Sequence, residues 1–177
     1  MLQNRISGGR RPPNRLNLPQ PGLFHRRRKW ATVVAMTDVH APHRDAEQIV
    51  RLLGGAGLRP TRQRRTLAAL LFGNGDRHVT AERLHEEAVG AGQRMSLATV
   101  YNTLHQFRRA GLLRELAVDG QRAYFDTNTS NHNHFYIESE GNLVDIPSDC
   151  IRVDGLPLPP AGMRISHIDV VVRLVKA

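Results

Sequence analysis

Two histidines separated by one residue are the feature of this sequence best suited to metal chemistry. His132 and His134 lie at the start of a short stretch, residues 133–137, that is predicted to form a β-strand. Alternate residues of a strand point to the same side, so the two imidazoles would face the same way. Neutral imidazoles with carboxylates nearby can chelate zinc, ferrous iron or manganese. Such a pair also occurs on ordinary solvated surfaces, and the spacing alone leaves both interpretations open.

The same histidines raise the question of an enzyme. The string His132-Asn133-His134 suggests an HNH nuclease, but that motif spreads its residues over a ββα unit, so adjacent residues cannot assemble its metal site. The sequence also contains no Ser/His/Asp order, no glycine-rich phosphate loop and no zinc-hydrolase signature. We therefore expect no enzymatic activity, and a metal-dependent nuclease is a remote alternative.

Four helices are predicted before these histidines. Apolar spacing places them at 46–53, 61–72, 81–91 and 96–110, with Thr80 and Ser96 as N-caps of the last two. The last helix has one apolar stripe and an opposite face without acidic residues: Ala98, Thr99, Asn102, Gln106 and Arg109. Short polar side chains on such a face can approach base edges in the major groove of DNA. A small helical domain with an ordinary solvated face is the alternative.

Strands are predicted after the helices. Apolar stretches at 112–116 and 123–125 flank an Asp119-Gly120 turn, which is typical of a β-hairpin. Further strands are predicted at 133–137, 143–146 and 165–175, with a short helix around 149–153. The predicted fold class is α+β: an N-terminal winged helix-turn-helix at 46–126, followed by a small α/β dimerisation domain at 127–177. The second part has a small core, so pairing two copies would bury its remaining apolar surface.

Charge divides the sequence into a basic and an acidic half. The formal net charge is +9; residues 58–114 hold ten basic and four acidic residues, and residues 115–177 hold five and nine. This division predicts a nucleic-acid-binding part joined to a part that does not contact nucleic acid. The single cysteine, Cys150, excludes an intrachain disulfide and is expected to be a small core residue. No apolar run approaches the roughly 18 residues of a membrane helix, so a soluble cytoplasmic protein is expected.

The N-terminal segment is predicted to be a disordered basic tail and linker at residues 1–45. Residues 1–35 contain eight basic residues and no acidic one. Three interpretations stay open: an arm that lies on DNA, a targeting segment, or a start codon placed too early, with Met36 as the true start.

Several motifs resemble the ferric uptake regulator family. They are Gly-Leu-Arg-Pro-Thr-Arg-Gln-Arg at 57–64, His-Val-Thr-Ala-Glu at 78–82 and Ser-Leu-Ala-Thr-Val-Tyr-Asn-Thr-Leu at 96–104, and the resemblance covers about 56–175. Thr-Val-Tyr-Asn-Thr-Leu, Tyr-Phe-Asp-Thr-Asn and the final Asp-Val-Val-Val-Arg-Leu at 169–174 also resemble the Irr subgroup, the iron response regulators.

The resemblance implies a homodimer that binds double-stranded promoter DNA, with the 96–110 helix in the major groove. Tyr101 would lie near thymine methyl groups, with Asn102 on the groove side. Arg59 matches a position near the minor groove and Arg64 one near the phosphate backbone. The implied DNA-binding residues are Arg59, Arg64, Ser96, Thr99, Tyr101 and Asn102.

The resemblance also implies a regulatory metal site for iron, manganese or zinc between the two halves. Its residues would be His78, Asp126, His132, His134 and Asp145. Irr members sense haem, and the same resemblance makes His78, His132 and His134 candidates for haem binding. An ion held by both halves could fix their relative angle and thereby the spacing of the two DNA-reading helices.

The sequence departs from the family at several positions. The four cysteines of the family's structural zinc site are absent, with Ile137 and Glu140 at the first pair. A second metal site is also lost, since its usual ligand positions hold Asn131, Asn133 and Arg152. The three consecutive histidines common in the Irr subgroup and the Cys-Pro haem motif are missing.

These observations predict a dimeric, iron-responsive transcription regulator of the Irr kind, active under iron limitation and responsive to haem. The alternative is a conventional metal-dependent repressor of the same family that uses ferrous iron or manganese as co-repressor.

Overall fold

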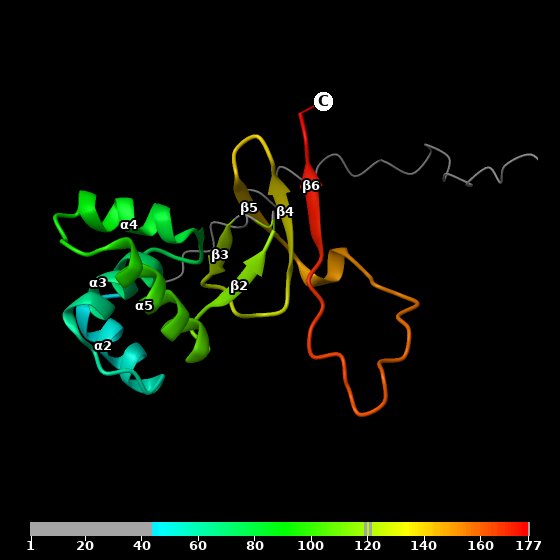
Figure 1. The fold of residues 1–177 in the computed structure, drawn as a ribbon, viewed down its shortest axis with the longest axis horizontal. Coiled ribbons are helices and arrows are strands. Elements are labelled where there is room, and N and C mark those ends of the chain that lie inside the picture. Colours follow the sequence, from blue (N-terminus) through cyan, green and yellow to red (C-terminus); the bar gives the residue numbers. More distant parts are fainter. Residues whose placement is uncertain (1–43, 119, 121, 177) are drawn as a thin grey trace, which may run out of the picture. The chain divides into compact units, whose positions relative to one another are not determined.

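The computed structural model describes residues 44–118, 120 and 122–176 (Figure 1). The predicted basic tail at 1–35, and all but the last two residues of the predicted 1–45 segment, lie outside this part. Helices occupy the first half of the described chain and strands the second, so the predicted α+β class is confirmed. Among the described helices, none is long and apolar enough to cross a membrane.

Four helices form close to their predicted positions. They are α2 (Ala46–Gly55), α3 (Arg62–Phe72), α4 (Ala81–Gly90) and α5 (Leu97–Arg109). Each begins after a polar residue whose side-chain oxygen accepts a backbone N–H of the first turn: Asp45, Thr61, Thr80 and Ser96. The apolar stripe predicted on α5 faces the core, because Val100, Leu104 and Phe107 are fully buried.

Three short strands follow or join the helices. β1 (His78–Val79), β2 (Arg114–Ala117) and β3 (Ala123–Asp126) form an antiparallel sheet in the order β1-β3-β2. Asp126 on the central strand is opposite His78 on one side and Arg114 on the other. β1 was not predicted, because two residues are too short to show a period. This strand nevertheless carries a candidate metal ligand to the sheet.

A second sheet has the order β5-β4-β6. β4 (Asn133–Ile137) pairs antiparallel with β5 (Asn142–Ile146) and parallel with β6 (Val171–Leu174). The register places His134 directly opposite Asp145. Two further candidate ligands therefore lie on neighbouring strands.

Three predictions in the C-terminal part are wrong. The strand predicted at 165–175 is limited to Val171–Leu174, because β4 begins at Asn133: its last backbone bond in this direction joins the His134 N–H to the Val170 carbonyl, and residues 165–169 have no β4 backbone to pair with. The predicted helix at 149–153 is only a single 3-10 turn, Ser148–Cys150, that lacks a side-chain cap. Cys150 ends this turn and is exposed, so it is not a core residue.

Two clusters of buried residues meet at the β2–β3 hairpin. The larger joins the helices to the hairpin through residues such as Leu67, Leu104 and Phe125. The smaller includes Leu116 and Tyr124 from the hairpin, together with Tyr136 and Leu143 from the second sheet. The Tyr124 hydroxyl also donates to the Gly141 carbonyl at 3.0 Å. The hairpin therefore attaches the second sheet to the helical part.

Candidate metal centre

Four strands and one loop bring five candidate ligands together. His78 comes from β1, Asp126 from the end of β3, His134 from β4 and Asp145 from β5. His132 lies immediately before β4. The sequence positions span 68 residues, but strand pairing places His78 beside Asp126 and His134 beside Asp145. The two pairs lie where the two sheets meet.

The ligand atoms of these residues converge on one small volume. One ligand atom from each of His78, His132, His134 and Asp145 lies within 4.8 Å of all the others. His132 Nε2 is 3.0 Å from Asp126 Oδ2, and His78 Nε2 is 3.0 Å from Asp145 Oδ1. The imidazoles of His132 and His134 point to the same side, with ring centroids 4.5 Å apart. A set of three imidazoles and two carboxylates at these distances can enclose a single ion.

Several of these atoms are buried without a hydrogen-bond partner. His78 Nε2, His132 Nε2 and Asp145 Oδ1 are inaccessible to solvent, and they lie close together without the alignment of a hydrogen bond. Buried polar atoms are almost always satisfied in folded proteins, because leaving one unpaired costs about 1–3 kcal/mol. A divalent cation among them would satisfy all three atoms at once. The donor set therefore fits a metal ion.

Charge within the centre also favours a cation. Burial lowers the pKa of His78, but the adjacent Asp126 and Asp145 carboxylates outweigh burial and raise this pKa from 6.5 to about 9. Burial raises the pKa of Asp126 and of Asp145, but the neighbouring histidines reverse this effect and hold both pKa values below the usual range. Both carboxylates are therefore ionised at neutral pH, and the centre holds a positive charge in the form of a proton on His78.

Three contacts from the 127–132 loop orient the ligands. The Asn128 backbone N–H donates to Asp126 Oδ1 at 2.8 Å, and its side-chain amide donates to Asp145 Oδ2 at 3.2 Å. The Ser130 carbonyl lies 2.9 Å from His132 Nδ1. These contacts direct the other carboxylate oxygens and His132 Nε2 inward. Sequence reasoning missed Asn128 and Ser130, whose only signal was a run of Thr, Asn and Ser typical of a turn.

The predicted DNA-binding residues lie on α3 and α5 or just before them. Asn102 is exposed on α5, and the Ser96 and Thr99 hydroxyls lie 2.9 Å apart at its first turn. Arg59 is exposed, whereas Arg64 donates from Nε to Gln106 Oε1 at 3.0 Å. Arg64 therefore joins α3 to the helix predicted to read DNA.

Tyr101 has a partner that sequence reasoning missed. Its hydroxyl donates to Glu82 Oε1 on α4 at 2.6 Å. Because Tyr101 is half-buried, its ring packs against the core while its hydroxyl reaches the surface. No signal in the sequence connects two residues 19 positions apart on different helices.

The positions where metal ligands are missing are not part of this cluster: Asn131 and Asn133 alternate with His132 and His134 along the chain but are not among its ligands. Glu140 and Arg152 are exposed, and Ile137 ends β4. Within residues 44–118, 120 and 122–176, the His78, His132, His134 and Asp145 group is the one cluster of three or more side chains placed to hold a metal.

The structure therefore combines capped helices and a β-hairpin with a small sheet, joined at a buried His/Asp centre. The model of the Ferric uptake regulator family matches residues 55–172. The chain belongs to this family, so the resemblance of its motifs to the family is confirmed.

Curated and solved relatives agree with this assignment. The chain is 33% identical over 124 residues to the peroxide operon regulator of Bacillus subtilis (strain 168), covering 70% of this chain and 85% of that protein. The ferric uptake regulator of Pseudomonas aeruginosa with manganese is 26% identical, with a TM-score of 0.55, and covers 72% of this chain and 97% of that one. The Vibrio cholerae regulator is similar in fold, with 21% identity, a TM-score of 0.57 and coverage of 70% and 96%. Membership of the Irr subgroup stays a prediction.

Proposed function

We propose that this protein is a dimeric repressor whose binding to promoter DNA depends on a divalent ion, iron, manganese or zinc, held by His78, Asp126, His132, His134 and Asp145. The observation that carries the proposal is the convergence at one point of buried ligand atoms that lack a hydrogen bond. The relatives support it, because they include peroxide-responsive repressors and a family member solved with manganese. This is the conventional alternative of the two functions expected from the sequence.

The proposed mechanism uses the position of the centre in the chain. Residues 46–126 would form the winged-helix DNA-binding domain, and residues 127–177 the dimerisation and sensing domain. His78 and Asp126 belong to the first part, whereas His132, His134 and Asp145 belong to the second. A bound ion supplies positive charge that both parts share. The five side chains would then hold the two parts at one angle, which is a two-state element that ion binding can bias.

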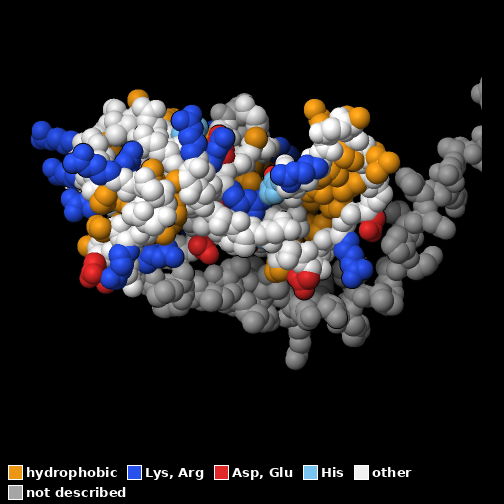
Figure 2. Space-filling view, turned by 90° about the horizontal axis from the view of Figure 1, so that it is seen from below, with side chains coloured by type: hydrophobic (Ala, Val, Ile, Leu, Met, Phe, Trp, Pro, Cys, Tyr) orange, Lys and Arg blue, Asp and Glu red, His pale blue; other side chains and the backbone are white. Residues whose placement is uncertain are grey.

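The surface of the helical part suits DNA. Figure 2 shows Lys and Arg side chains gathered over this part on the face that it draws. Asn102, Ser96 and Thr99 would face base edges, with Arg59 and Arg64 near the sugar-phosphate backbone. Tyr101 would contact thymine methyl groups while Glu82 holds its hydroxyl. Arginines that neutralise phosphates would supply most of the affinity.

The second part has the surface expected of a dimer. Large apolar side chains between residues 153 and 175 are exposed in the single chain: Val153, Leu156, Leu158, Met163, Ile165, Ile168, Leu174 and Val175. Figure 2 shows hydrophobic side chains gathered over this part as well. Pairing two copies would remove this surface from water, and a two-fold dimer would match a two-fold DNA site.

The geometry supports a small ion more strongly than haem. The side chains of His78, His132 and His134 are 12%, 5% and 0% exposed, so they offer no open face to a flat macrocycle. Their ligand atoms instead surround a space of single-ion size. Haem responsiveness of the Irr kind stays a prediction, and the DNA-binding experiment described next tests it.

The test is DNA binding to a duplex selected from random sequences, measured metal-free, with Mn²⁺ and with haemin. We expect binding that requires Mn²⁺ in the wild type and is lost in His134→Ala. The control is His85→Ala, whose imidazole contacts the Met95 carbonyl, away from the centre. Binding without metal that is abolished by haemin would favour the Irr function instead. Plasmid cleavage in Mn²⁺ that disappears in His134→Ala would overturn the regulator proposal in favour of a nuclease.

A further inference from the structure

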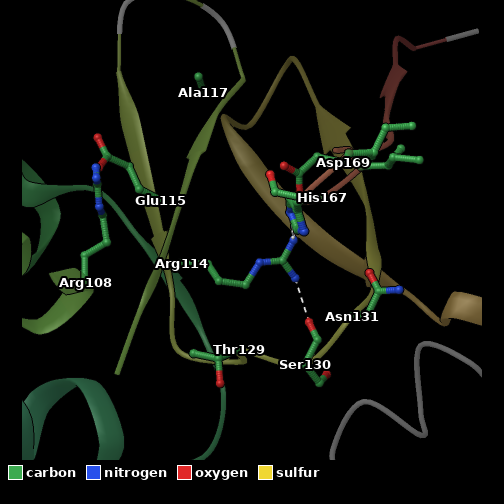
Figure 3. A pocket seen from close by; sticks show the side chains of 12 residues that line it. Arg108, Arg114, Glu115, Ala117, Thr129, Ser130, Asn131, His167 and Asp169 are labelled. Carbon is green, nitrogen blue, oxygen red and sulfur yellow. Dashed lines mark hydrogen bonds and ion pairs between the residues drawn. The ribbon is translucent and has the colours of Figure 1, made fainter. Parts of the chain in front are cut away.

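A pocket of about 920 Å³ lies between β2 and residues 165–169, beside the metal centre. Arg114 of β2 crosses this pocket, and Figure 3 shows its guanidinium between Ser130 and the pair His167 and Asp169. It donates to the Ser130 carbonyl at 2.6 Å and to Asp169 Oδ1 at 2.6 Å, and it lies 3.0 Å from His167 Nε2. One side chain therefore contacts two segments that are far apart in the sequence.

The first of these segments touches the centre. The Ser130 carbonyl that accepts from Arg114 is also 2.9 Å from His132 Nδ1. When His132 presents Nε2 to an ion, Nδ1 carries the proton and donates to that carbonyl. Arg114 lies 3.4 Å from Nδ1 and cannot donate to it in this tautomer. The Arg114 guanidinium and His132 Nδ1 thus both donate to the Ser130 carbonyl oxygen. This shared acceptor fixes the orientation of the His132 ring.

The second segment is held at its end by the His134 backbone N–H, which donates to the Val170 carbonyl at 3.0 Å, and before that point by the same arginine side chain. Residues 165–170 form no strand, since β6 begins at Val171. The contacts of Arg114 with His167 and Asp169 link this segment to β2. The Arg114 side chain is only 13% exposed, whereas Asp169 is 37% exposed, so water reaches the carboxylate side of the ion pair but little of the arginine. Removal of Asp169 would leave the mostly buried guanidinium without its carboxylate partner, which is the loss that the variants below measure.

We propose that Arg114 is a positioning residue through which ion binding at His132 and the attachment of residues 165–170 become mutually dependent. The inference rests on the metal-dependent function proposed above. Asp169 accepts a hydrogen bond from one nitrogen of the Arg114 guanidinium and fixes its position. The other guanidinium nitrogen then donates to the Ser130 carbonyl, which orients His132. Coupling between two sites is reciprocal. Ion binding therefore stabilises the contacts of residues 165–170, and loss of those contacts weakens ion binding.

The first test is a double-mutant cycle measured as Mn²⁺ affinity by calorimetry. Arg114→Gln and Asp169→Asn should each weaken Mn²⁺ binding by roughly tenfold, the lower end of effects seen for groups that orient metal ligands. The double variant should be no weaker than Arg114→Gln alone, because Asp169 acts only through Arg114. The proposal would be overturned if the losses of Mn²⁺ affinity in the two single variants multiplied in the double variant. It would also be overturned if the single variants bound Mn²⁺ like the wild type.

Arg108→Gln is the matched control. Arg108 lines the same pocket and pairs with Glu115, and no hydrogen bond or ion pair joins it to Ser130, His132 or Asp169 among the described residues. Its variant should bind Mn²⁺ like the wild type. Should Arg114→Gln fail to fold, Asp169→Asn alone carries the same expectation, since its carboxylate is partly exposed and its loss removes no core packing.

The second test is hydrogen exchange of the backbone amides of residues 166–169. Mn²⁺ should slow their exchange in the wild type and in Arg108→Gln, but not in Arg114→Gln. A merely structural Arg114 would lower the melting temperature yet leave the Mn²⁺ effect in place, which would contradict the proposal. Mn²⁺ binding that is lost in His134→Ala but unchanged in Arg114→Gln defeats only this inference. A wild type that binds no Mn²⁺ defeats the proposed function together with it.

Discussion

At the scale of single residues, the metal centre is a competition between a proton and an ion. Asp126 and Asp145 are ionised and largely buried, so they need a positive charge nearby. Without an ion, that charge is the proton of His78, whose pKa is raised to about 9 despite the opposing effect of burial. An ion that binds His78 Nε2 must displace this proton. Metal affinity and pH are therefore linked.

The linkage has a definite sign. Because the pKa of His78 is raised from 6.5 to about 9, the proton stabilises the metal-free fold fully below pH 6.5, and this stabilisation is lost as pH rises through about 9. The apparent Mn²⁺ affinity should therefore rise by about tenfold per pH unit between pH 7 and 9. Calorimetry in two buffers of different ionisation enthalpy should show about one proton released per ion. The control variant His85→Ala should show the same rise of Mn²⁺ affinity with pH as the wild type. An Mn²⁺ affinity independent of pH would contradict the assignment of His78 as the ligand that carries the proton.

The spacing of single residues predicted only part of this centre. His132 and His134 could be placed on one side of a strand because a strand repeats every two residues. His78, Asp126 and Asp145 came from the resemblance to the family, since no local period connects β1, β3 and β5. Arg114 could not be found at all. Its contact with a backbone carbonyl of a loop depends on loop geometry, which leaves no mark on residue types.

At the scale of elements, helices were predicted better than strands. The caps and apolar stripes of α2 to α5 are local signals, and every one of these helices forms within about two residues of its predicted ends. A strand needs a partner, so alternation at 165–169 was not sufficient where β4 offers no further backbone to pair with. Conversely, β1 forms with two residues because β3 is available beside it.

Arg64 connects two of these helices and leads to a prediction about DNA. It lies on the first turn of α3, where its guanidinium contacts Gln106 of α5 and the carbonyl of Arg59. Arg64→Ala should weaken binding to all DNA sequences, and the slope of log affinity against log salt should shrink by about 1, because phosphate contacts are not sequence-selective. Fluorescence anisotropy over a salt series measures both quantities.

The control for Arg64 is another arginine of the helical part. Arg51→Ala on α2 removes an equal charge, but Arg51 pairs with Glu47 on an exposed face of its own helix. Its variant should keep the wild-type salt slope. An unchanged slope in Arg64→Ala would instead remove Arg64 from the DNA interface.

At the scale of the whole molecule, the net charge of +9 is unevenly distributed. Residues 1–35 hold eight basic residues and no acidic one, so residues 36–177 are nearly neutral. Within these, the excess of basic residues lies in 58–114, which includes α3, α4 and α5, and the excess of acidic residues lies in 115–177. Specific recognition is therefore expected from the helices, and the N-terminal charge is expected to add sequence-independent attraction.

Deletion of residues 1–35 separates the two contributions. Specific affinity for a selected duplex should be retained, whereas nonspecific affinity should fall, with a salt slope smaller by up to about 7 if all eight basic residues contact phosphates. Replacing Arg26, Arg27, Arg28 and Lys29 by Gln in the full chain removes half of this charge and should give about half of the change. Competition titrations with random-sequence DNA measure both affinities. Loss of specific binding on deletion would mean that the segment acts as an arm on the DNA, and the helical part would then account for only a share of the recognition.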